Sequence, residues 1–309
     1  MNEFSRRDML RLIGGTVAAA SLPIGAATAQ SGRESSAMLT RAIPSSGEEL
    51  PVIGLGTWQV FDVGASGEAA LEPVLAEFAK NGGRIVDSSP MYGRAEEVVG
   101  DLSAKLKLRD SLFLATKVWT RGKQAGIESM EHSLARMNAK RMDLMQVHNL
   151  VDVNTHLGTL REWKQEGRVR YIGITHYNAS ALPEVERVLK SQPVDFLQIN
   201  YSMHEREVEQ RVLPLGQEKG VAVIINRPFG GGDLLRRLRG APLPNEAREV
   251  DCASWAQFLL KWILGHPAVT CVIPATNKLE HLRDNMQAGH GRLPDHDMRE
   301  RMAELVATC

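Results

Sequence analysis

Four residues of this sequence could together transfer a proton to an oxygen atom. Asp87, Lys117 and His148 each end a short apolar run, and Tyr92 follows five positions after Asp87. A free tyrosine, with a pKa of roughly 10, is a weak acid, but a neighbouring ammonium stabilises its phenolate and lowers that pKa. A carboxylate keeps the ammonium charged, and an imidazole can orient a substrate carbonyl. Such a set suits protonation of an oxygen while the carbon accepts a hydride, for which a nicotinamide is the natural donor.

The spacing of these residues indicates which elements must position them. Lys117 lies 30 residues after Asp87, and His148 lies 31 residues after Lys117. Each interval is about the length of one strand-helix-strand unit. Parallel strands that end in different polar residues, one repeat apart, are typical of the active-site rim of an α/β barrel. We therefore expect Asp87, Tyr92, Lys117 and His148 to meet at one rim.

Strands and helices alternate along nearly the whole chain. Strands are predicted at 53–56, 84–87, 112–117, 144–148, 171–175, 196–200, 221–226 and 270–273. Amphipathic helices are predicted at 68–80, 95–107, 127–138, 155–166, 181–191, 208–219, 252–265 and 279–288. The alternation predicts a single-domain (β/α)8 TIM barrel over residues 38–309. Residues 38–43 and 50–53 are expected to form an N-terminal β-hairpin ahead of it.

Several other classes of protein are disfavoured. A doubly wound dinucleotide-binding sheet is the competing architecture, but Gly54-Leu-Gly56 lacks the third glycine of its fingerprint. Gly230-Gly231-Gly232 lacks the lysine of a phosphate-binding P-loop. We expect no metal, because the sequence has no HExxH, no EF-hand loop and no Cys/His cluster. The 37 basic and 37 acidic residues balance, so the charge gives no reason to expect a nucleic-acid partner.

Residues 1–29 are predicted to be a twin-arginine-type signal peptide. Arg6-Arg7 precedes an apolar run over 10–27, and Ala27-Thr28-Ala29 offers small residues for cleavage. Such a signal would direct the protein through the twin-arginine export machinery to the periplasm. An uncleaved signal would instead tether the protein to the membrane. Residues 30–37 are rich in Ser, Gly and Glu and are predicted to form a disordered lead-in.

The chain resembles the aldo-keto reductase family. The family's motifs occur in its order as Gly54-Leu-Gly-Thr-Trp58, Asp87-Ser-Ser-Pro-Met-Tyr92-Gly, Ala115-Thr-Lys117-Val-Trp119, Gln146-Val-His148-Asn, Leu197-Gln198-Ile and Val272-Ile-Pro274. The resemblance implies reduction of a small aldehyde or ketone by NAD(P)H on a β/α barrel. Tyr92 would be the general acid, tuned by Lys117 and Asp87, and His148 would orient the substrate. Trp58 and Trp119 would line the carbonyl pocket.

The resemblance also implies a set of cofactor contacts, at Gly56, Thr57, Trp58, Thr175, His176, Gln198, Asn226, Arg227, Thr276, His281 and Asn285. The chain departs from the family at several of them. Thr175-His176 replaces Ser-Asn, and Asn226-Arg227-Pro228 stands where the family has the aromatic residue that stacks on the nicotinamide. Ala275-Thr276 and His281 stand where the family reads the 2′-phosphate with Lys-Ser and Arg. On family grounds we expect NADP(H) rather than NAD(H).

Two readings remain open from the sequence. His176 is either a cofactor contact or a residue that only fills the rim, and His156 is expected to be solvated on the surface. For the whole protein, the alternative to a reductase is a non-catalytic nicotinamide-binding redox sensor or accessory subunit. The intact set of Asp87, Tyr92, Lys117 and His148 favours the reductase.

Overall fold

Eight parallel strands form a sheet that closes on itself. The computed structural model describes residues 37–309, in which the strand order is β10-β9-β8-β7-β6-β5-β4-β3. The strands are β3 (Leu55–Gly56), β4 (Ile85–Asp87), β5 (Phe113–Val118), β6 (Met142–His148), β7 (Val169–Thr175), β8 (Phe196–Asn200), β9 (Ala222–Asn226) and β10 (Val269–Val272). Parallel bridges from Ile53 to Val272 and from Gly56 to Ala275 join the two edges. The predicted (β/α)8 barrel is therefore confirmed.

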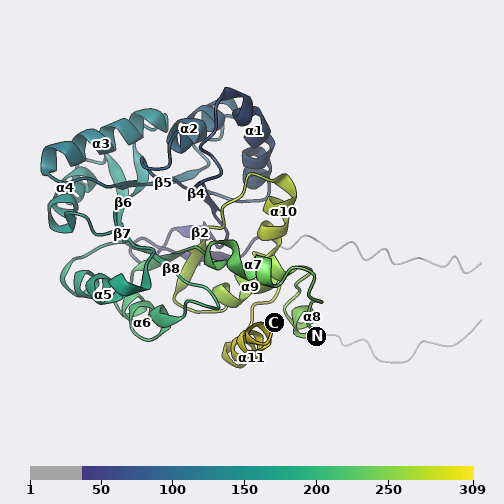
Figure 1. Cartoon of the computed structure of the whole chain (residues 1–309). Coiled ribbons are helices and arrows are strands. Elements are labelled where there is room, and N and C mark those ends of the chain that lie inside the picture. The colour runs from purple at the N-terminus through teal and green to yellow at the C-terminus, as the bar shows by residue number, and fades with distance from the viewer. Residues whose placement is uncertain (1–36) are drawn as a thin grey trace, which may run out of the picture. The chain divides into compact units, whose positions relative to one another are not determined.

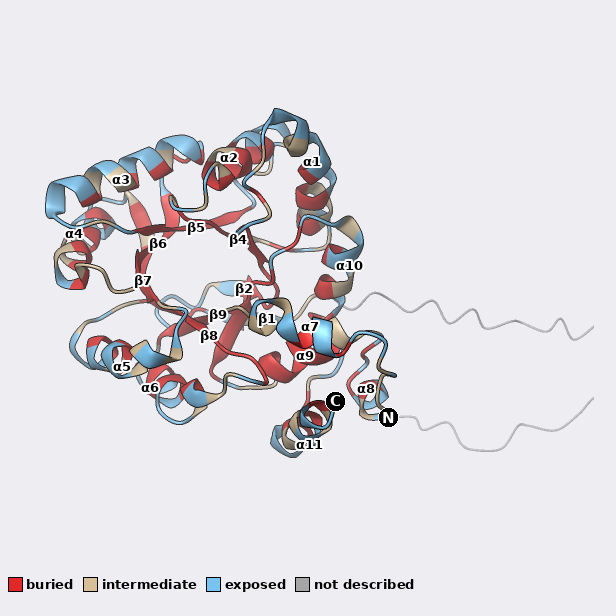
Figure 2. Ribbon diagram, viewed as in Figure 1, coloured by how far each residue is buried: buried red, intermediate tan, exposed pale blue. Residues whose placement is uncertain are grey.

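Helices surround the ring of strands (Figure 1). They are α1 (Ala65–Lys80), α2 (Ala95–Lys105), α3 (Lys123–Arg136), α4 (Val153–Gln165), α5 (Leu182–Ser191), α6 (Val212–Glu218), α7 (Asp233–Arg237), α8 (Glu246–Glu249), α9 (Trp255–Leu264), α10 (Leu279–Gln287) and α11 (His296–Ala307). In α1 the buried residues Leu71, Val74, Leu75 and Phe78 recur at helical spacing and form one apolar face. Figure 2 shows such buried faces turned towards the strands, with exposed residues on the outside.

Two predicted helices begin later than expected. The segment predicted as one helix over 208–219 is divided into the 3-10 turn η2 (Glu207–Glu209) and α6. Pro214 has no N–H to donate and is tolerated only in a first turn, so the helix can begin no earlier than the residues just before it. α9 begins at Trp255 because Ser254 caps it, its side chain accepting a hydrogen bond from the Gln257 amide.

The N-terminal hairpin closes one end of the barrel. It consists of β1 (Thr40–Ala42) paired antiparallel with β2 (Glu49–Pro51). Ile43 and Leu50 pack in one cluster with inward-facing residues of strands β4 to β10. Glu48 bonds Arg84 at 3.0 Å and also Arg170, near the amino ends of two strands. The open end of the barrel is therefore the one at which the strands finish.

Some expectations fall outside the described residues or are wrong. The predicted signal at 1–29 and residues 30–36 of the lead-in lie outside the described residues. Between residues 37 and 309, no helix is long and apolar enough to cross a membrane.

The expectation for His156 is wrong. His156 is fully buried rather than solvated, with Nε2 2.8 Å from the Thr120 carbonyl oxygen. Its ring fits because Gly126 has no Cβ, which would lie 2.4 Å from it.

Candidate active site

The strand register brings the predicted catalytic residues to one rim. Asp87 ends β4 and His148 ends β6, while Lys117 is the penultimate residue of β5. Asp87 pairs with Ala115, and Lys117 pairs with Gln146, two residues before His148. Because the strands are parallel, these positions all lie at the carboxyl end of the barrel.

Lys117 and Asp87 form a buried ion pair. The Lys117 Nζ donates to Asp87 Oδ2 at 2.6 Å and to the Ser88 carbonyl oxygen at 2.6 Å. The other carboxylate oxygen accepts from Gln198 Nε2 at 2.7 Å and Gln146 Nε2 at 3.3 Å. Burial acts to lower the pKa of Lys117, but the attraction of Asp87 and Tyr92 outweighs it, so that the pKa is raised. The lysine is therefore a fixed positive charge.

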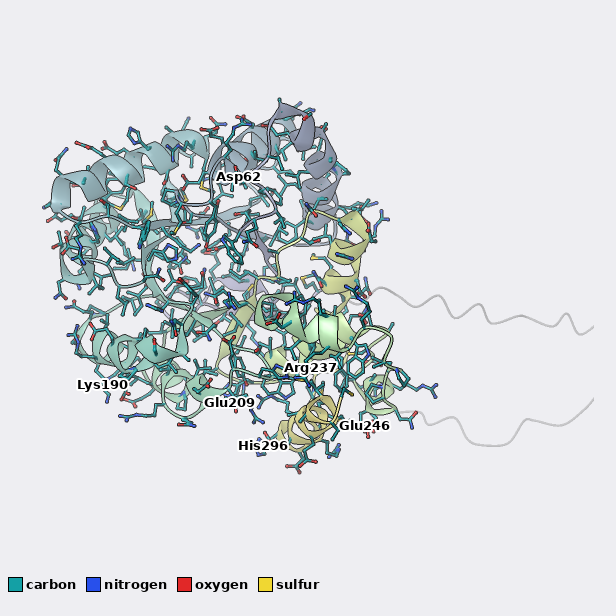
Figure 3. All side chains as sticks on the ribbon, viewed as in Figure 1. Asp62, Lys190, Glu209, Arg237, Glu246 and His296 are labelled. Carbon is teal, nitrogen blue, oxygen red and sulfur yellow. The ribbon has the colours of Figure 1, made fainter. Side chains whose placement is uncertain are left out.

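The backbone around Tyr92 is fixed by an aspartate from another loop. Gly93 has φ +58, and a Cβ there would lie 2.3 Å from the Asp62 carboxylate. Asp62, labelled in Figure 3, accepts a hydrogen bond from the Arg94 amide at 2.9 Å. The Tyr92 amide donates to the Ser89 carbonyl oxygen at 3.0 Å. The turn that presents Tyr92 therefore depends on glycine at position 93 and on Asp62. Asp62 was not among the site residues predicted from the sequence.

Tyr92 keeps its proton in the protein without ligand. Desolvation raises the pKa of its phenol, whereas Lys117, with Nζ 5.0 Å from the ring centroid, acts to lower it. The net pKa is raised, which differs from the expectation that the lysine lowers it. The reason is that withdrawal of the phenol from water outweighs the attraction of the neighbouring ammonium. A phenol that is protonated at neutral pH can act as a proton donor.

His148 is uncharged at neutral pH. Its ring lies edge-on to Tyr92, with 6.5 Å between ring centroids, and 6.3 Å from the ring of Trp119. Burial, together with the charges of Lys117 and His176, lowers the pKa of His148 to about 3. Its Nδ1 is buried with no hydrogen-bond partner among residues 37–309. The imidazole is thus a neutral hydrogen-bonding group beside the phenol.

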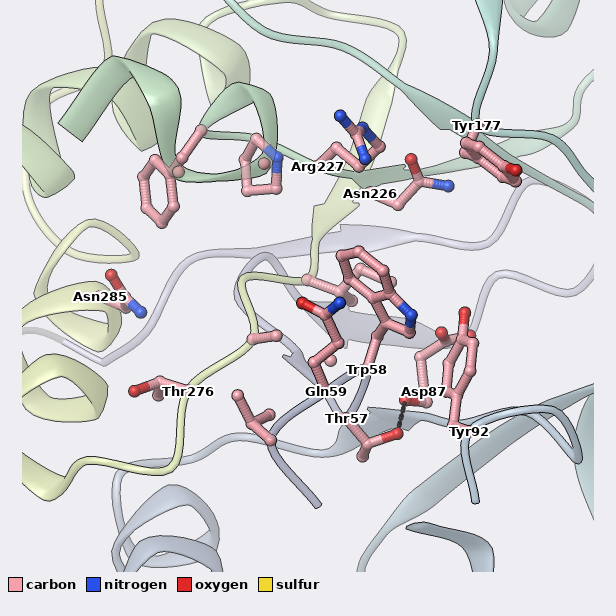
Figure 4. Close-up of a pocket in the computed structure, with 18 of the residues that line it drawn as sticks. Thr57, Trp58, Gln59, Asp87, Tyr92, Tyr177, Asn226, Arg227, Thr276 and Asn285 are labelled. Atoms are coloured by element: carbon pink, nitrogen blue, oxygen red, sulfur yellow. Dashed lines mark hydrogen bonds between the residues drawn. The ribbon is translucent and has the colours of Figure 1, made fainter. Parts of the chain in front are cut away.

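A cavity of about 800 Å³ opens beside these residues. It is lined by most of the predicted site residues, namely Gly56, Thr57, Trp58, Asp87, Tyr92, His148, Thr175, Gln198, Asn226, Arg227, Thr276, His281 and Asn285. Figure 4 shows Trp58 and Tyr92 towards one end and Thr276 and Asn285 towards the other. Three predicted residues do not line it, namely Lys117, Trp119 and His176. Lys117 is fully buried, the Trp119 ring lies 6.3 Å from the ring of the lining residue His148, and the His176 carbonyl oxygen accepts a hydrogen bond from the lining residue Asn226.

A group of amide side chains forms the wall at the ends of β7, β8 and β9. The Gln198 Oε1 accepts from Thr175 Oγ1 at 3.2 Å and from Asn226 Nδ2 at 3.4 Å. Asn226 Nδ2 also donates to the His176 carbonyl oxygen at 3.3 Å. The Nδ1 of His176 accepts from the next two backbone amides, each at 3.1 Å. A neutral His176 ring therefore carries its proton on Nε2.

Arg227 is an unpaired cation in the cavity wall. It forms no ion pair with any other described residue, and its Nε is buried without a partner. Its φ of 49 is unusual for a residue other than glycine. The guanidinium lies against Gly231, where a Cβ would be 3.2 Å from a guanidinium nitrogen. Gly230, Gly231 and Gly232 all have positive φ, so the glycine run that fails as a P-loop forms a turn beside this arginine.

The other end of the cavity is lined by Thr276, His281 and Asn285. Arg283, the nearby arginine of α10, does not line the cavity, and its Nε donates a hydrogen bond to Glu77 Oε1 at 2.8 Å. Asp284 also lines it and accepts hydrogen bonds from two side chains near the start of α9.

Several lining residues were not predicted from the sequence. They are Gln59, Val60, Met91, Tyr177, Pro228, Phe229, Gly231, Gly232, Leu235, Ala256, Ile273 and Asp284, whereas Ala275, which also lines the cavity, was expected beside Thr276. Tyr177 follows two positions after the last residue of β7, and Met91 directly precedes Tyr92. Their place in loops after barrel strands is the signal that could have identified them.

The comparisons with known proteins agree with this geometry. Residues 52–305 match the model of the aldo/keto reductase family. The chain is 28% identical over 257 residues to methylglyoxal reductase YeaE of Escherichia coli (strain K12), covering 80% of this chain and 89% of that protein. It is 25% identical over 291 residues to an NADP-dependent D-sorbitol-6-phosphate dehydrogenase of Malus domestica, covering 82% and 90%.

Solved structures show the same fold. An aldo/keto reductase from Klebsiella pneumoniae, in complex with NADP and acetate, has a TM-score of 0.72 at 25% identity, covering 84% of this chain and 93% of that one. The thermostable aldo-keto reductase Tm1743 has a TM-score of 0.72 at 26% identity, covering 87% and 100%. Since the family match extends over most of the sequence and includes the rim residues, the chain belongs to the aldo/keto reductase family of oxidoreductase enzymes.

Proposed function

We propose that this protein reduces an aldehyde or ketone with NADP(H), with Tyr92 as the general acid. The observation that carries the proposal is the arrangement at the rim. A protonated phenol stands beside a buried Lys117–Asp87 pair and a neutral His148, at one end of a cavity that also contains an unpaired arginine. The choice of NADP(H) is supported by the Klebsiella structure, which is a complex with NADP, and by the Malus relative, which is named NADP-dependent.

The cavity has the size and the polar groups that a nucleotide cofactor needs. Its volume of about 800 Å³ falls in the range of small-molecule and cofactor sites. Asn226 Oδ1 and Arg227 Nε are buried there without partners, and buried polar groups are normally hydrogen-bonded. Arg227 and the Gly230–Gly232 turn would hold the diphosphate, since guanidinium groups and such turns suit anions.

The remaining cofactor contacts follow the shape of the cavity. Gln198 and Thr175, near Asp87, would hold the nicotinamide end. Thr276, His281 and Asn285 would hold the adenosine end. When bound, the reduced nicotinamide supplies the hydride.

The chain's own residues handle the proton. His148, being neutral, hydrogen-bonds the carbonyl oxygen and orients it towards the phenol of Tyr92. Tyr92 donates its proton to that oxygen, and the ammonium of Lys117 stabilises the phenolate that remains. Asp87 keeps Lys117 charged and in place, and is itself held by the amide of Gln198.

A cofactor titration followed by a turnover assay tests the proposal. NADPH and NADH are titrated into the protein by fluorescence, and a panel of aldehydes and ketones is then supplied. We expect tighter binding of NADPH and oxidation of NADPH with at least one carbonyl. Binding without turnover on any carbonyl would favour the redox-sensor alternative, and no binding of either nucleotide would contradict both.

We also propose that residues 1–29 direct export to the periplasm by the twin-arginine pathway. The support is the sequence alone: Arg6-Arg7, the apolar run after it and the small residues at 27–29. The full chain and an Arg6→Lys, Arg7→Lys variant would be compared by cell fractionation. We expect the wild-type protein outside the cytoplasm, shortened if cleaved and membrane-bound if uncleaved. An identical cytoplasmic distribution of both would contradict the proposal.

A further inference from the structure

A second cavity, of about 470 Å³, lies at the end of the barrel that the N-terminal hairpin closes. Pro44, in the turn between β1 and β2, lines it together with Asp195 and Gly220, which stand just before β8 and β9 begin. Residues of α4 and of the C-terminal end of α6 complete its wall, and these helices lie on either side of α5 around the ring (Figure 1). The cavity shares no lining residue with the one beside Tyr92, and its volume is typical of small-molecule sites.

The wall of this second cavity is positively charged, although the whole chain has no net charge. Three cations, Arg161, Lys164 and Lys219, line it with a single carboxylate, that of Asp195. The two oxygens of Asp195 accept from Lys164 Nζ at 2.8 and 2.6 Å, and Oδ2 also accepts from the Ile172 amide at 3.0 Å. Asp195 therefore neutralises only one of the three cations. Since an ammonium has three N–H donors, Lys164 keeps one for a ligand.

The other two cations lack a strong counter-ion. Arg161 forms no ion pair with any described residue, and its Nη2 donates to the uncharged Oε1 of Gln192. The Arg161 Nε is buried and has no hydrogen-bond partner among residues 37–309. Lys219 pairs only with its neighbour Glu218, at 3.5 Å with both side chains exposed, and exposed pairs contribute little. Because a guanidinium presents a planar fork of donors that matches carboxylates and phosphates, the wall is suited to an anion.

The rest of the wall is mainly apolar. Its apolar residues are Pro44, Ile172, Pro193 and Val194. Pro193 and Val194 belong to the segment that joins α5 to β8, and Pro44 lies against Gly220, where a Cβ would be 3.7 Å from the Pro44 Cβ. A ligand that fits both parts of the wall has an anionic head group and a short hydrocarbon body.

We propose that this cavity binds a small organic anion, a carboxylate or a phosphate monoester with a short hydrocarbon body. Arg161 and Lys219 hold the head group through charge-assisted hydrogen bonds, and the body lies against Pro44, Pro193 and Val194. The bound anion contacts the hairpin turn, α4 and the end of α6 together, so it stabilises the folded protein. The inference is independent of the reaction at Tyr92.

Titrations with matched small molecules test this inference. Calorimetry would compare butyl phosphate, butyrate, inorganic phosphate and butan-1-ol on wild type, Arg161→Gln, Lys219→Gln and Lys107→Gln, the last being an exposed lysine outside the cavity. We expect butyl phosphate or butyrate to bind wild type at least about tenfold more tightly than butan-1-ol, and the tighter of the two identifies the head group. Arg161→Gln should weaken that binding by about tenfold to hundredfold and Lys219→Gln by less, whereas Lys107→Gln should leave it unchanged.

Further controls locate the binding and decide the outcome. Arg227→Ala removes a cation of the cavity beside Tyr92, so binding at the second cavity should survive this change. Melting temperatures without ligand report whether each variant folds, and the tighter-binding anion should raise the melting temperature of wild type more than that of Arg161→Gln. The inference would be overturned by no binding of either organic anion, equal binding of butan-1-ol, or inorganic phosphate binding as tightly as butyl phosphate. Unchanged affinity in both Arg161→Gln and Lys219→Gln, or loss of binding in Arg227→Ala, would also overturn it.

Discussion

Replacing His148 by glutamine should make the stability of the protein less sensitive to acid. Burial and the nearby charges of Lys117 and His176 lower the pKa of His148 to about 3. In the unfolded chain, the same imidazole returns to its ordinary pKa of roughly 6.5. Below that value, the unfolded chain binds a proton that the folded protein does not bind. The stability linked to this group is therefore complete above pH 6.5 and is lost as the pH falls towards about 3.

The size of the effect follows from the pKa difference. A pH of 5 lies about 1.5 units below the pKa of the unfolded imidazole, which is therefore protonated, whereas the folded one is still neutral. Each pH unit below that pKa corresponds to about 1.4 kcal/mol. The wild-type protein should therefore lose about 2 kcal/mol of unfolding free energy between pH 7 and pH 5 through this group alone. Glutamine offers hydrogen-bonding groups but does not titrate, so the variant should lack that loss.

The assay is urea unfolding of wild type and His148→Gln at the two pH values. The free energy of unfolding should fall by about 2 kcal/mol more in wild type than in the variant. His148→Asn, a second amide that cannot titrate, differs in size and so controls for altered packing; it should show the same reduced acid sensitivity. An equal change with pH in all three proteins would show that His148 is not held neutral, and would refute the reasoning.

Three further changes test the arrangement around the site. Lys117→Met leaves Asp87 buried without its counter-ion, so we expect a loss of about 3–5 kcal/mol in chemical unfolding, much of it regained in the double variant with Asp87→Asn. Gly93→Ala forces a left-handed residue against Asp62, which should cost at least about 1–2 kcal/mol in thermal unfolding and lower kcat by displacing Tyr92. Arg227→Ala should weaken NADPH binding roughly tenfold to hundredfold in a fluorescence titration.

Each of these expectations has a contradicting outcome. A double variant no more stable than Lys117→Met alone would show that the cost is not an unpaired Asp87 charge. Wild-type melting and turnover in Gly93→Ala would mean that Asp62 does not anchor the turn. Unchanged NADPH affinity in Arg227→Ala, with Arg227→Lys as the charge-retaining control, would exclude this arginine from the anion site.

The barrel and its rim residues could be predicted because the relevant signals are local. An apolar strand that stops at a polar residue is visible in the sequence, and repeating it about every 30 residues predicts parallel neighbours. Since parallel strands end at the same edge, Asp87, Lys117 and His148 had to meet once the fold class was correct. Their separation in the sequence therefore did not obscure the site.

Contacts between loops could not be predicted in this way. Asp62 approaches Gly93 from a different loop, and Glu77 pairs with Arg283 across 206 residues. No periodic pattern connects such positions. His156 looked like a solvated polar residue of α4, because its burial depends on the space left by Gly126 on α3.

The direction of a pKa also depends on competing distances and burial. The sequence correctly suggested that a lysine would stand near Tyr92, but it contains no measure of how far the phenol is withdrawn from water. In the structure that withdrawal outweighs Lys117, so the pKa of Tyr92 is raised. The difference favours the proposed role, since a general acid must hold its proton before it donates.

The most direct test of the central claim is a single-turnover measurement on protein already loaded with NADPH. A saturating carbonyl substrate, identified in the turnover panel, is mixed with loaded wild type and loaded Tyr92→Phe, and the loss of NADPH absorbance is followed. General-acid catalysis contributes typically about 10²–10⁴-fold, so the variant should bind NADPH as tightly as wild type but oxidise it slower by about that factor. Oxidation of NADPH at the wild-type rate by Tyr92→Phe would contradict the assignment of Tyr92 as the proton donor.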